Sequence, residues 1–223
     1  MIWVAEIGSA HGGNKSLAFE MIRQAKYAGA TIAKFQFGWT KAAQKKYAGN
    51  YNEARYVDDW ADDLADWCKY FDIELMASIW SMEGLDVALE VIDRVKIAHQ
   101  MKDEKLIRRA ELFWGRENMF ISGENIICSD KYPTMPEDVD DLFWDKIGNF
   151  DGVRQFNDKQ FGYSSHSHGI ADALLAVSLG AQYIEKHVTL DKTNPFPRDN
   201  SFAITFDEFA QMVRLGDEMA RLR

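Results

Sequence analysis

The stretch FGYSSHSHGI, residues 161–170, gathers serines and histidines between a mixed segment and an apolar run. A second stretch, QYIEKHVTL at residues 182–190, places Glu185 and His187 within an apolar, strand-like sequence. Imidazole, carboxylate and hydroxyl groups can bind metals, transfer protons and hold anions. Other chemically capable residues interrupt or follow apolar runs: Glu6, His11, Lys34, Gln36, Ser78, Lys96, His99, Ser122, Ser129, Asp130, Ser164 and His166.

Two chemical groupings can be formed from these residues. The first comprises Lys34, Lys96, Ser78, Ser122 and Ser164. Lysines supply positive charge and serines supply hydroxyl donors, which a phosphate or carboxylate requires. The second is His166 with His187, whose imidazoles suit a divalent metal such as Mn²⁺ or Zn²⁺ when waters and a substrate oxygen complete the site. Each residue alone has a simpler explanation in packing or helix capping, so the hypothesis depends on their common position.

Short apolar runs alternate with amphipathic segments along the chain. Strands are expected at 3–8, 31–37, 73–78, 94–99 and 182–190, and helices at 14–30, 53–70, 82–91, 105–115, 168–181 and 207–222. This alternation is typical of βαβ units and a parallel sheet. The fragments KYAGATIAKFQF and VSLGAQYIEKHV share one order of helix end, Gly-Ala, strand and lysine, which indicates a repeated βα unit.

We predict a TIM-type (β/α)8 barrel, with residues 1–223 as one catalytic domain. A doubly wound sheet is the alternative, but no GxGxxG follows the first strand. The polar residues collected above lie at the carboxyl ends of the expected strands, where such barrels build their active sites.

One region does not fit a regular barrel. In MFISGENIICSDKYPT, residues 119–134, two apolar runs lie closer together than a crossover between parallel strands allows. We therefore expect an irregular or shortened barrel around residues 116–135. It would be a hairpin, one bent strand or the remnant of a lost helix.

Composition excludes several classes of function. The chain has 223 residues, 47% of them hydrophobic, and a formal net charge of −9. It can bury a core, and it lacks the basic stripe of a nucleic-acid surface, although a local anion site is compatible with this charge. Cys68 and Cys128 have neither metal nor disulfide spacing, which fits reduced thiols. Without a signal-peptide pattern or a membrane-length apolar run, we expect a cytoplasmic protein that binds neither nucleic acid nor membranes.

Four motifs resemble, in order, the barrel of the sialic acid synthase (N-acetylneuraminate synthase) family. They are AEIGSAHGG, AKFQF, FGYSSHS and IEKHVTLDKTNPFPRDNSFAITFDEF. The family typically reads AEIG-x-NH-x-G, VKFQ, G-x-SDHT and IEKHFTLD. The resemblance runs from Trp3 to about Leu222 and is weaker at residues 40–70 and 100–160. It covers the barrel only, without the family's antifreeze-like C-terminal domain.

The resemblance implies a sialic acid biosynthetic enzyme that condenses phosphoenolpyruvate with an N-acetylmannosamine-like aldose to give a nonulosonate and phosphate. It implies a divalent metal, Mn²⁺ or Mg²⁺, on His166 and His187, which polarises the aldehyde while Glu6 handles a proton. The other substrate contacts implied are Lys34, Gln36, Ser78, Lys96, Ser122, Ser164, Tyr132 and Asp199. The resemblance also allows a homodimer.

Several positions depart from the family's pattern. Ala10 replaces the asparagine of NH, and Ser165 replaces the aspartate of SDHT, which removes a carboxylate expected beside a metal ligand. His99 replaces a phosphate-binding serine, and Met101 replaces an acid. These changes bear on the sugar and on turnover. Two alternatives therefore remain: another metal-dependent barrel aldolase or lyase, and an inactive barrel that acts as a binding partner.

Overall fold

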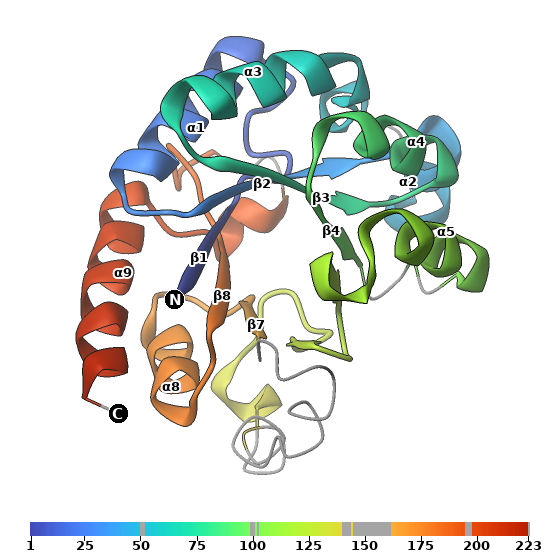
Figure 1. Ribbon diagram of the computed structural model, residues 1–223. Helices are drawn as coiled ribbons and strands as arrows, with labels where there is room; N and C mark the ends of the chain where they lie inside the picture. The colour runs from blue at the N-terminus through green and yellow to red at the C-terminus, as the bar shows by residue number, and fades with distance from the viewer. Residues whose placement is uncertain are drawn as a thin grey trace.

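Eight parallel strands form a nearly closed barrel in the computed structural model of the chain (Figure 1). The structure describes residues 1–49, 52–98, 101, 103–139, 144, 162–194 and 198–222. The strands are β1 (Ile2–Glu6), β2 (Ile32–Phe37), β3 (Glu74–Ile79), β4 (Arg94–Ile97), β5 (Met119–Ile121), β6 (Ile126–Ile127), β7 (Gly162–Ser165) and β8 (Tyr183–His187). Their hydrogen-bonded order is β5-β4-β3-β2-β1-β8-β7-β6. This order follows the chain around a ring, which confirms the predicted barrel and excludes the doubly wound sheet.

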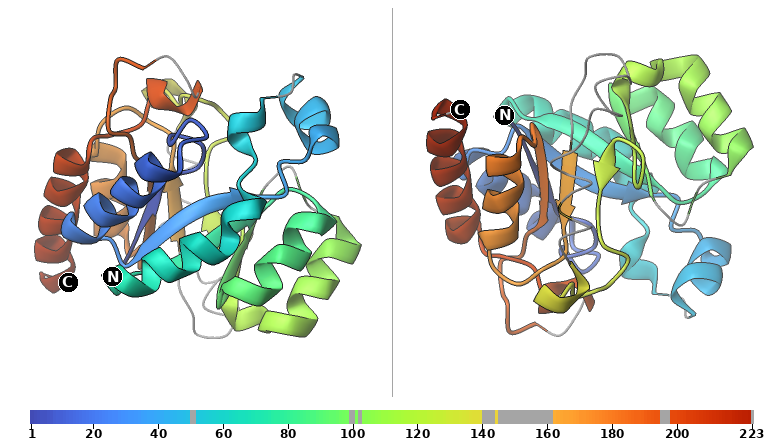
Figure 2. Two further views of the ribbon diagram at one scale, coloured as in Figure 1. Left: turned by 90° about the horizontal axis from the view of Figure 1, so that it is seen from above. Right: turned by 90° about the horizontal axis from the view of Figure 1, so that it is seen from below.

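Helices surround the strands (Figures 1 and 2). They are α1 (Lys15–Tyr27), α2 (Lys41–Ala48), α3 (Ala61–Phe71), α4 (Met82–Val91), α5 (Glu104–Trp114), α8 (Ala171–Leu179) and α9 (Phe206–Arg221). No helix within the described ranges is long and apolar enough to cross a membrane.

The segment between β2 and β3 differs from the sequence prediction. Residues 41–48, expected as loop, form α2, which Thr40 caps by accepting a hydrogen bond from the amide of Ala43 at 3.2 Å. The helix expected at 53–70 begins only at Ala61, after two short 3₁₀ turns. Asp58 lies in the second turn, where its buried carboxylate accepts the amide of Gly38 at 3.0 Å. This contact fixes the turn against the end of β2 and delays the start of α3.

Helix α1 shows how the sequence pattern produces the outer layer. Asn14 caps it, as predicted, by accepting hydrogen bonds from the amides of Ser16 and Leu17. The buried face comprises Ala18, Met21, Ile22 and Ala25, whereas Leu17, expected on that face, is exposed. The buried face of α1 therefore begins at Ala18 rather than at Leu17, one residue later than the apolar pattern indicated.

Helix α9 packs very closely on β1. A side chain at Gly216 would place its Cβ 2.3 Å from the ring of Trp3, so only glycine allows this approach. The indole of Trp3 also donates a hydrogen bond from Nε1 to Asp217 Oδ1 at 3.0 Å. The last helix is thereby fixed to the first strand, which borders β8.

Apolar side chains fill the barrel interior below the carboxyl ends of the strands. This cluster contains Val4, Ile32, Met76, Phe120, Ile126 and Tyr183, all buried. Because inward-facing residues alternate along each strand, the next inward positions toward the carboxyl ends lie directly above this cluster. The cluster is therefore the floor on which a site at the carboxyl ends would rest.

The expected irregularity lies between β5 and β6, which only residues 122–125 connect. Ser122 bridges to Ile126 in parallel, so the two runs do not form a hairpin. The chain turns tightly at Gly123 and then continues parallel to β5 in a displaced position. Of the three expected arrangements, this corresponds to the bent strand. A helical crossover is unnecessary because β6 begins beside the end of β5 rather than beside its start.

The side chain of Asn125 completes this step. Its Nδ2 donates to Met119 O at 2.8 Å, and its Oδ1 accepts from the amide of Ile121 at 2.7 Å. These are the two hydrogen bonds that a neighbouring strand's peptide group would make to β5. On the other side, a Cβ at Gly162 would lie 2.1 Å from Ile126 Cδ1, so any larger residue there would require the Ile126 side chain to move. We call the β5–β6 junction, residues 119–127, the seam.

Candidate active site

Side chains alternate between the two faces of each strand, and this alternation places the predicted site residues in the barrel interior. On β8, Tyr183, Glu185 and His187 occupy alternate positions, and Tyr183 belongs to the interior floor. The same rule places Glu6 above Val4 on β1 and Lys34 above Ile32 on β2. All these polar side chains are buried.

Lysine and glutamate side chains from four strands meet above the floor. Lys96 Nζ lies 2.5 Å from Glu185 Oε1, and Lys34 Nζ lies 3.5 Å from the same oxygen. Lys34 also forms an ion pair with Glu6 Oε2. We call Glu6, Lys34, Lys96 and Glu185 the charged cluster. Two cations and two carboxylates thus neutralise one another out of contact with water.

The two carboxylates of the charged cluster have opposite pKa shifts. Burial raises the pKa of Glu6 to about 7, although Lys34 partly opposes this. Glu185 is equally buried, but Lys34 and Lys96 together outweigh burial and hold its pKa below the ordinary value. Burial also disfavours the charge of Lys34, yet Glu185 and Glu6 raise its pKa above the ordinary value. Glu6 is therefore the group of this cluster that can change its proton near neutral pH.

Gln36 connects Glu6 to the upper end of β2. Its Nε2 donates to Glu6 Oε1 at 3.2 Å, while its Oε1 accepts from Trp39 Nε1 at 2.6 Å. The indole can only donate, so it fixes which end of the amide faces Glu6. Gly8 leaves room for this contact, because a Cβ there would lie 2.9 Å from Glu6 Oε1.

The predicted serines lie around the charged cluster. Ser164 accepts from Lys96 Nζ at 3.3 Å and donates to Glu185 Oε1 at 2.8 Å. Ser78 pairs in register with Lys96 across β3 and β4. Ser122 follows Phe120 by two residues, which places it on the inward face, and it is buried. The structure therefore brings together the lysines and serines predicted as an anion site.

A second group surrounds the predicted metal ligands. The ring centroids of His166 and His187 are 5.7 Å apart, and Phe202 contacts both rings. Burial lowers the pKa of His166 to about 3 and holds the pKa of His187 well below its ordinary value. Both imidazoles are therefore neutral, the state in which histidine binds metals.

The residues present fit the histidine half of a metal site. His166 Nδ1 lies 3.2 Å from Ser129 O, so a proton on Nδ1 leaves the Nε2 lone pair free for an ion. Asp199 Oδ2 lies 3.8 Å from His187 Nδ1, where it can orient that ring. Among the described residues, no cluster of three or more histidine, cysteine or acidic side chains could hold a metal. Water and substrate oxygens would have to complete the coordination.

The two residues predicted on the sugar side lie beside this histidine pair. The ring of Tyr132 stacks on His166 with centroids 4.1 Å apart. Asp199 belongs to a short 3₁₀ turn, Arg198–Ser201, next to the buried Phe202.

Two expectations about individual residues need correction. His11 is not among the interior side chains: it lies between Phe35 and Trp60, and burial lowers its pKa to about 4. Ser165 faces the outside of the barrel, where it contacts Lys186 and Asp172, so its side chain is not directed at the histidine pair. Alternation along β7 requires this, because Ser164 faces inward. His99, the replacement expected in the phosphate site, lies outside the described residues.

The sequence placed Glu185 at a strand end but did not assign it a role. It contacts both lysines, Ser164 and, through Oε2, the hydroxyl of Tyr183 at 2.8 Å. Its spacing of two residues from His187 on β8 was the signal that both face the interior.

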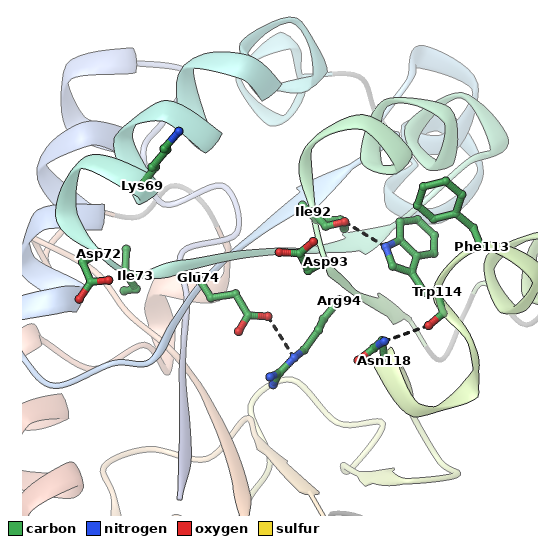
Figure 3. Close-up of a pocket in the computed structure, with 10 residues that line it drawn as sticks. All are labelled: Lys69, Asp72, Ile73, Glu74, Ile92, Asp93, Arg94, Phe113, Trp114 and Asn118. Carbon is green, nitrogen blue, oxygen red and sulfur yellow. Dashed lines mark hydrogen bonds and ion pairs between the residues drawn. The ribbon is translucent and has the colours of Figure 1, made fainter.

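A separate pocket of about 720 Å³ opens at the opposite end of the barrel (Figure 3). It is lined by the starts of β3 and β4 and the ends of α3 and α5, including Lys69, Glu74, Arg94 and Trp114. Arg94 Nε and Glu74 Oε1 pair at 3.2 Å across it. It does not contact the charged cluster, and barrel enzymes do not place catalysis at this end.

Fold and interior together define the class: a parallel (β/α) barrel with buried ionisable groups gathered at the carboxyl ends of its strands, the arrangement of barrel enzymes. Comparison with known proteins then shows which group of this class the chain is similar to. Residues 124–222 match the model described as the NeuB family. The predicted resemblance to the sialic acid synthases is confirmed.

Several similar curated proteins are synthases. The chain is 28% identical to human N-acetylneuraminate-9-phosphate synthase over 251 residues, covering 95% of this chain and 68% of that protein. It is 26% identical to pseudaminic acid synthase of Campylobacter jejuni subsp. jejuni serotype O:2 over 262 residues, covering 94% and 71%. These relatives are enzymes that form carbon–carbon bonds, which agrees with the predicted enzyme class.

A solved structure supports the fold over the whole chain. The N-acetylneuraminic acid synthetase of Leptospira borgpetersenii, in complex with citrate, superposes with a TM-score of 0.78 at 22% identity. The match covers 99% of this chain and 84% of that one. At this identity the comparison establishes the barrel and not its substrates.

Proposed function

We propose that the chain condenses phosphoenolpyruvate with an N-acetylmannosamine-like aldose, releasing phosphate and forming a nonulosonate. Carbon 3 of phosphoenolpyruvate would bond to the aldehyde carbon, whose oxygen gains a proton. The oxygen of a water molecule would add to carbon 2, and the bond from carbon 2 to the phosphate oxygen would break. The named activities of the related synthases support this reaction class.

The observation that carries the proposal is the buried lysine pair with its serines at the carboxyl ends of the strands. Lys34 and Lys96 supply two ammonium groups, and Ser164 a hydroxyl that already bonds Lys96. Phosphoenolpyruvate presents a phosphate and a carboxylate, so two cations suit its two anionic ends. Fixing both ends orients carbon 3 toward the aldehyde.

The glutamates hold the lysines ready in the absence of the anion. Glu185 forms ion pairs with Lys34 and Lys96 and directs both ammonium groups at one point. Glu6, with its pKa raised by burial to about 7, exists in both protonation states near neutrality. It can therefore give or take the proton that the aldehyde oxygen requires.

His166 and His187 would hold a divalent metal, Mn²⁺ or Mg²⁺, at the rim of the charged cluster. When bound, such an ion supplies Lewis-acid polarisation of a carbonyl oxygen. The neutral rings and the free Nε2 of His166 support this assignment. Tyr132 and Asp199, beside these rings, would contact the sugar.

Calorimetric titration of phosphoenolpyruvate, with and without Mn²⁺, tests the anion site. Lys96→Ala should weaken binding by about 10- to 100-fold, because charge-assisted hydrogen bonds of about 1.5–3 kcal/mol are lost. Ser164→Ala, which removes one neutral partner, should weaken binding less. Lys69→Ala, in the pocket of Figure 3, is the matched control and should bind as wild type does.

Circular dichroism would first establish that each variant folds. Unchanged affinity in a folded Lys96→Ala variant would overturn the proposed anion site, as would loss of binding in Lys69→Ala alone. A screen of aldoses for phosphate release would then identify the second substrate.

A further inference from the structure

A buried polar network lies on the outer face of the barrel, directly behind the two histidines. Ser165 and Lys186 are register partners on β7 and β8, and both face outward toward α8. Neither side chain is exposed to solvent. Apolar residues usually fill this layer between strands and helices, so a lysine here is unusual.

The ammonium group of Lys186 forms hydrogen bonds with the residues on both sides of His166. Its Nζ donates to Ser165 Oγ at 2.6 Å and also to the carbonyl oxygen of Ser167. His166 lies between these two serines, and His187 follows Lys186 directly in the chain. One side chain thus connects the backbone that carries one imidazole to the backbone that carries the other.

The network extends into the first turn of α8. Ser165 Oγ donates to Asp172 Oδ2 at 2.6 Å, and the hydroxyl of Tyr163 donates to the same oxygen at 2.8 Å. Asp172 thereby supplies a negative charge to balance Lys186 through the serine hydroxyl. Its Oδ1 is buried and has no hydrogen-bond partner within the part of the chain that the structure describes.

Burying this lysine is costly. Burial disfavours the charge of Lys186 and lowers its pKa to about 8. An apolar side chain of similar volume would avoid that cost, as replacements of buried ion pairs show. Packing alone therefore does not explain a lysine at this position, whereas its hydrogen bonds to the His166 segment do.

We infer that Lys186 is a positioning residue that sets the spacing of the His166 and His187 rings and thereby the affinity for the divalent cation. The inference rests on the proposed function, because that function places the cation on these histidines. It concerns a residue behind the site that touches neither the cation nor the substrates.

Titration calorimetry with Mn²⁺ alone, in the absence of substrates, tests the inference. Lys186→Met keeps the volume and removes the donors, and it should weaken Mn²⁺ binding by about 10- to 100-fold, the usual effect of losing a group that orients a ligand. The control is Lys192→Met, which removes an exposed lysine paired with Glu208 and should change affinity by less than about twofold.

A double variant separates positioning from stability. Lys186→Met leaves the partly buried charge of Asp172 without its cation and should lower the melting temperature. Adding Asp172→Asn removes that charge and should recover stability. Positioning by Lys186 requires Mn²⁺ binding to stay weak in the recovered double variant. Recovery of affinity together with stability would overturn the inference and leave Lys186 a structural residue.

His187→Ala distinguishes failure of the inference from failure of the proposed metal site. Loss of Mn²⁺ binding in His187→Ala with wild-type affinity in Lys186→Met would reject the positioning role alone. Unchanged Mn²⁺ binding in a folded His187→Ala variant would reject the metal site and the inference with it. Weak binding in both variants, with normal binding in Lys192→Met, is the expected result.

Discussion

Glu6 and Glu185 approach the same lysine, yet their surroundings give them different proton affinities. Glu185 has Lys34, Lys96, Ser164 and Tyr183 around its two oxygens, and these hold its charge. Glu6 has one lysine and one amide, which do not offset its burial. Two carboxylates within one cluster can therefore take separate roles, one as fixed counter-charge and one as proton carrier.

The raised pKa of Glu6 predicts a pH dependence of folding stability. The folded state prefers protonated Glu6, so this contribution is present below the ordinary pKa of 4.5 and is lost as pH rises through about 7. Glu6→Gln imitates the neutral form. Its stability relative to wild type should rise between pH 5 and pH 8 by up to about 3 kcal/mol.

Urea unfolding of wild type and Glu6→Gln across this pH range measures the two free energies of unfolding. Their difference excludes the contribution of the histidines, because both proteins contain the same histidines. Glu111→Gln, on the exposed side of α5, changes the same formal charge and should give no such trend. A stability difference between wild type and Glu6→Gln that stays constant with pH would contradict the assigned pKa direction.

Most of the candidate site could be predicted at the residue scale, because strand alternation and the barrel rule place Lys34, Lys96, Ser164 and His187 at one end. The role of Glu185 could not be predicted in this way, since its partners come from strands distant in sequence. Ser164 was predicted to line the anion site and does face inward, but no direction was predicted for Ser165. Hydrogen bonds with Lys186 and Asp172 show that Ser165 faces outward.

At the element scale, the seam shows that a barrel can lack a crossover helix between two strands. The side chain of Asn125 takes the place of a neighbouring strand's peptide group beside β5. The sequence indicated irregularity here because the connection is too short, but three arrangements satisfied the spacing equally. The parallel bridge from Ser122 to Ile126 distinguishes them.

Replacing Asn125 should destabilise the protein through the seam. Asn125→Ala removes two hydrogen bonds and leaves the Ile121 amide and the Met119 carbonyl without these partners, at a cost of about 2–4 kcal/mol in the free energy of unfolding. Asn118→Ala is the matched comparison, because Asn118 makes one such bond, to Trp114 O at 3.0 Å, and it should cost about half as much. Chemical denaturation measures both variants, and equal losses would show that Asn125 does not replace a strand.

At the scale of the whole molecule, the barrel could be predicted from the repeated βα unit. Each βα unit repeats the same order of elements, and parallel strands joined by helices of this length form a sheet that follows the chain. Sheet order and the solved relative agree with it. Sugar choice could not be predicted, because side chains beside the histidines, such as Tyr132 and Asp199, come from loops rather than repeated units.

The mutual neutralisation within the charged cluster also affects how fast an anion arrives. Lys34 and Lys96 are enclosed with two carboxylates, so little of their positive field reaches solvent, while the chain as a whole carries a net charge of −9. Phosphoenolpyruvate, the proposed substrate, should therefore be repelled at long range and attracted only after entry. Its association rate in stopped-flow should therefore increase when ionic strength rises from about 0.01 to about 0.15 M, because the Debye length shortens from about 30 to about 8 Å. A rate that falls with added salt would mean that the lysines act on the substrate before it enters the barrel.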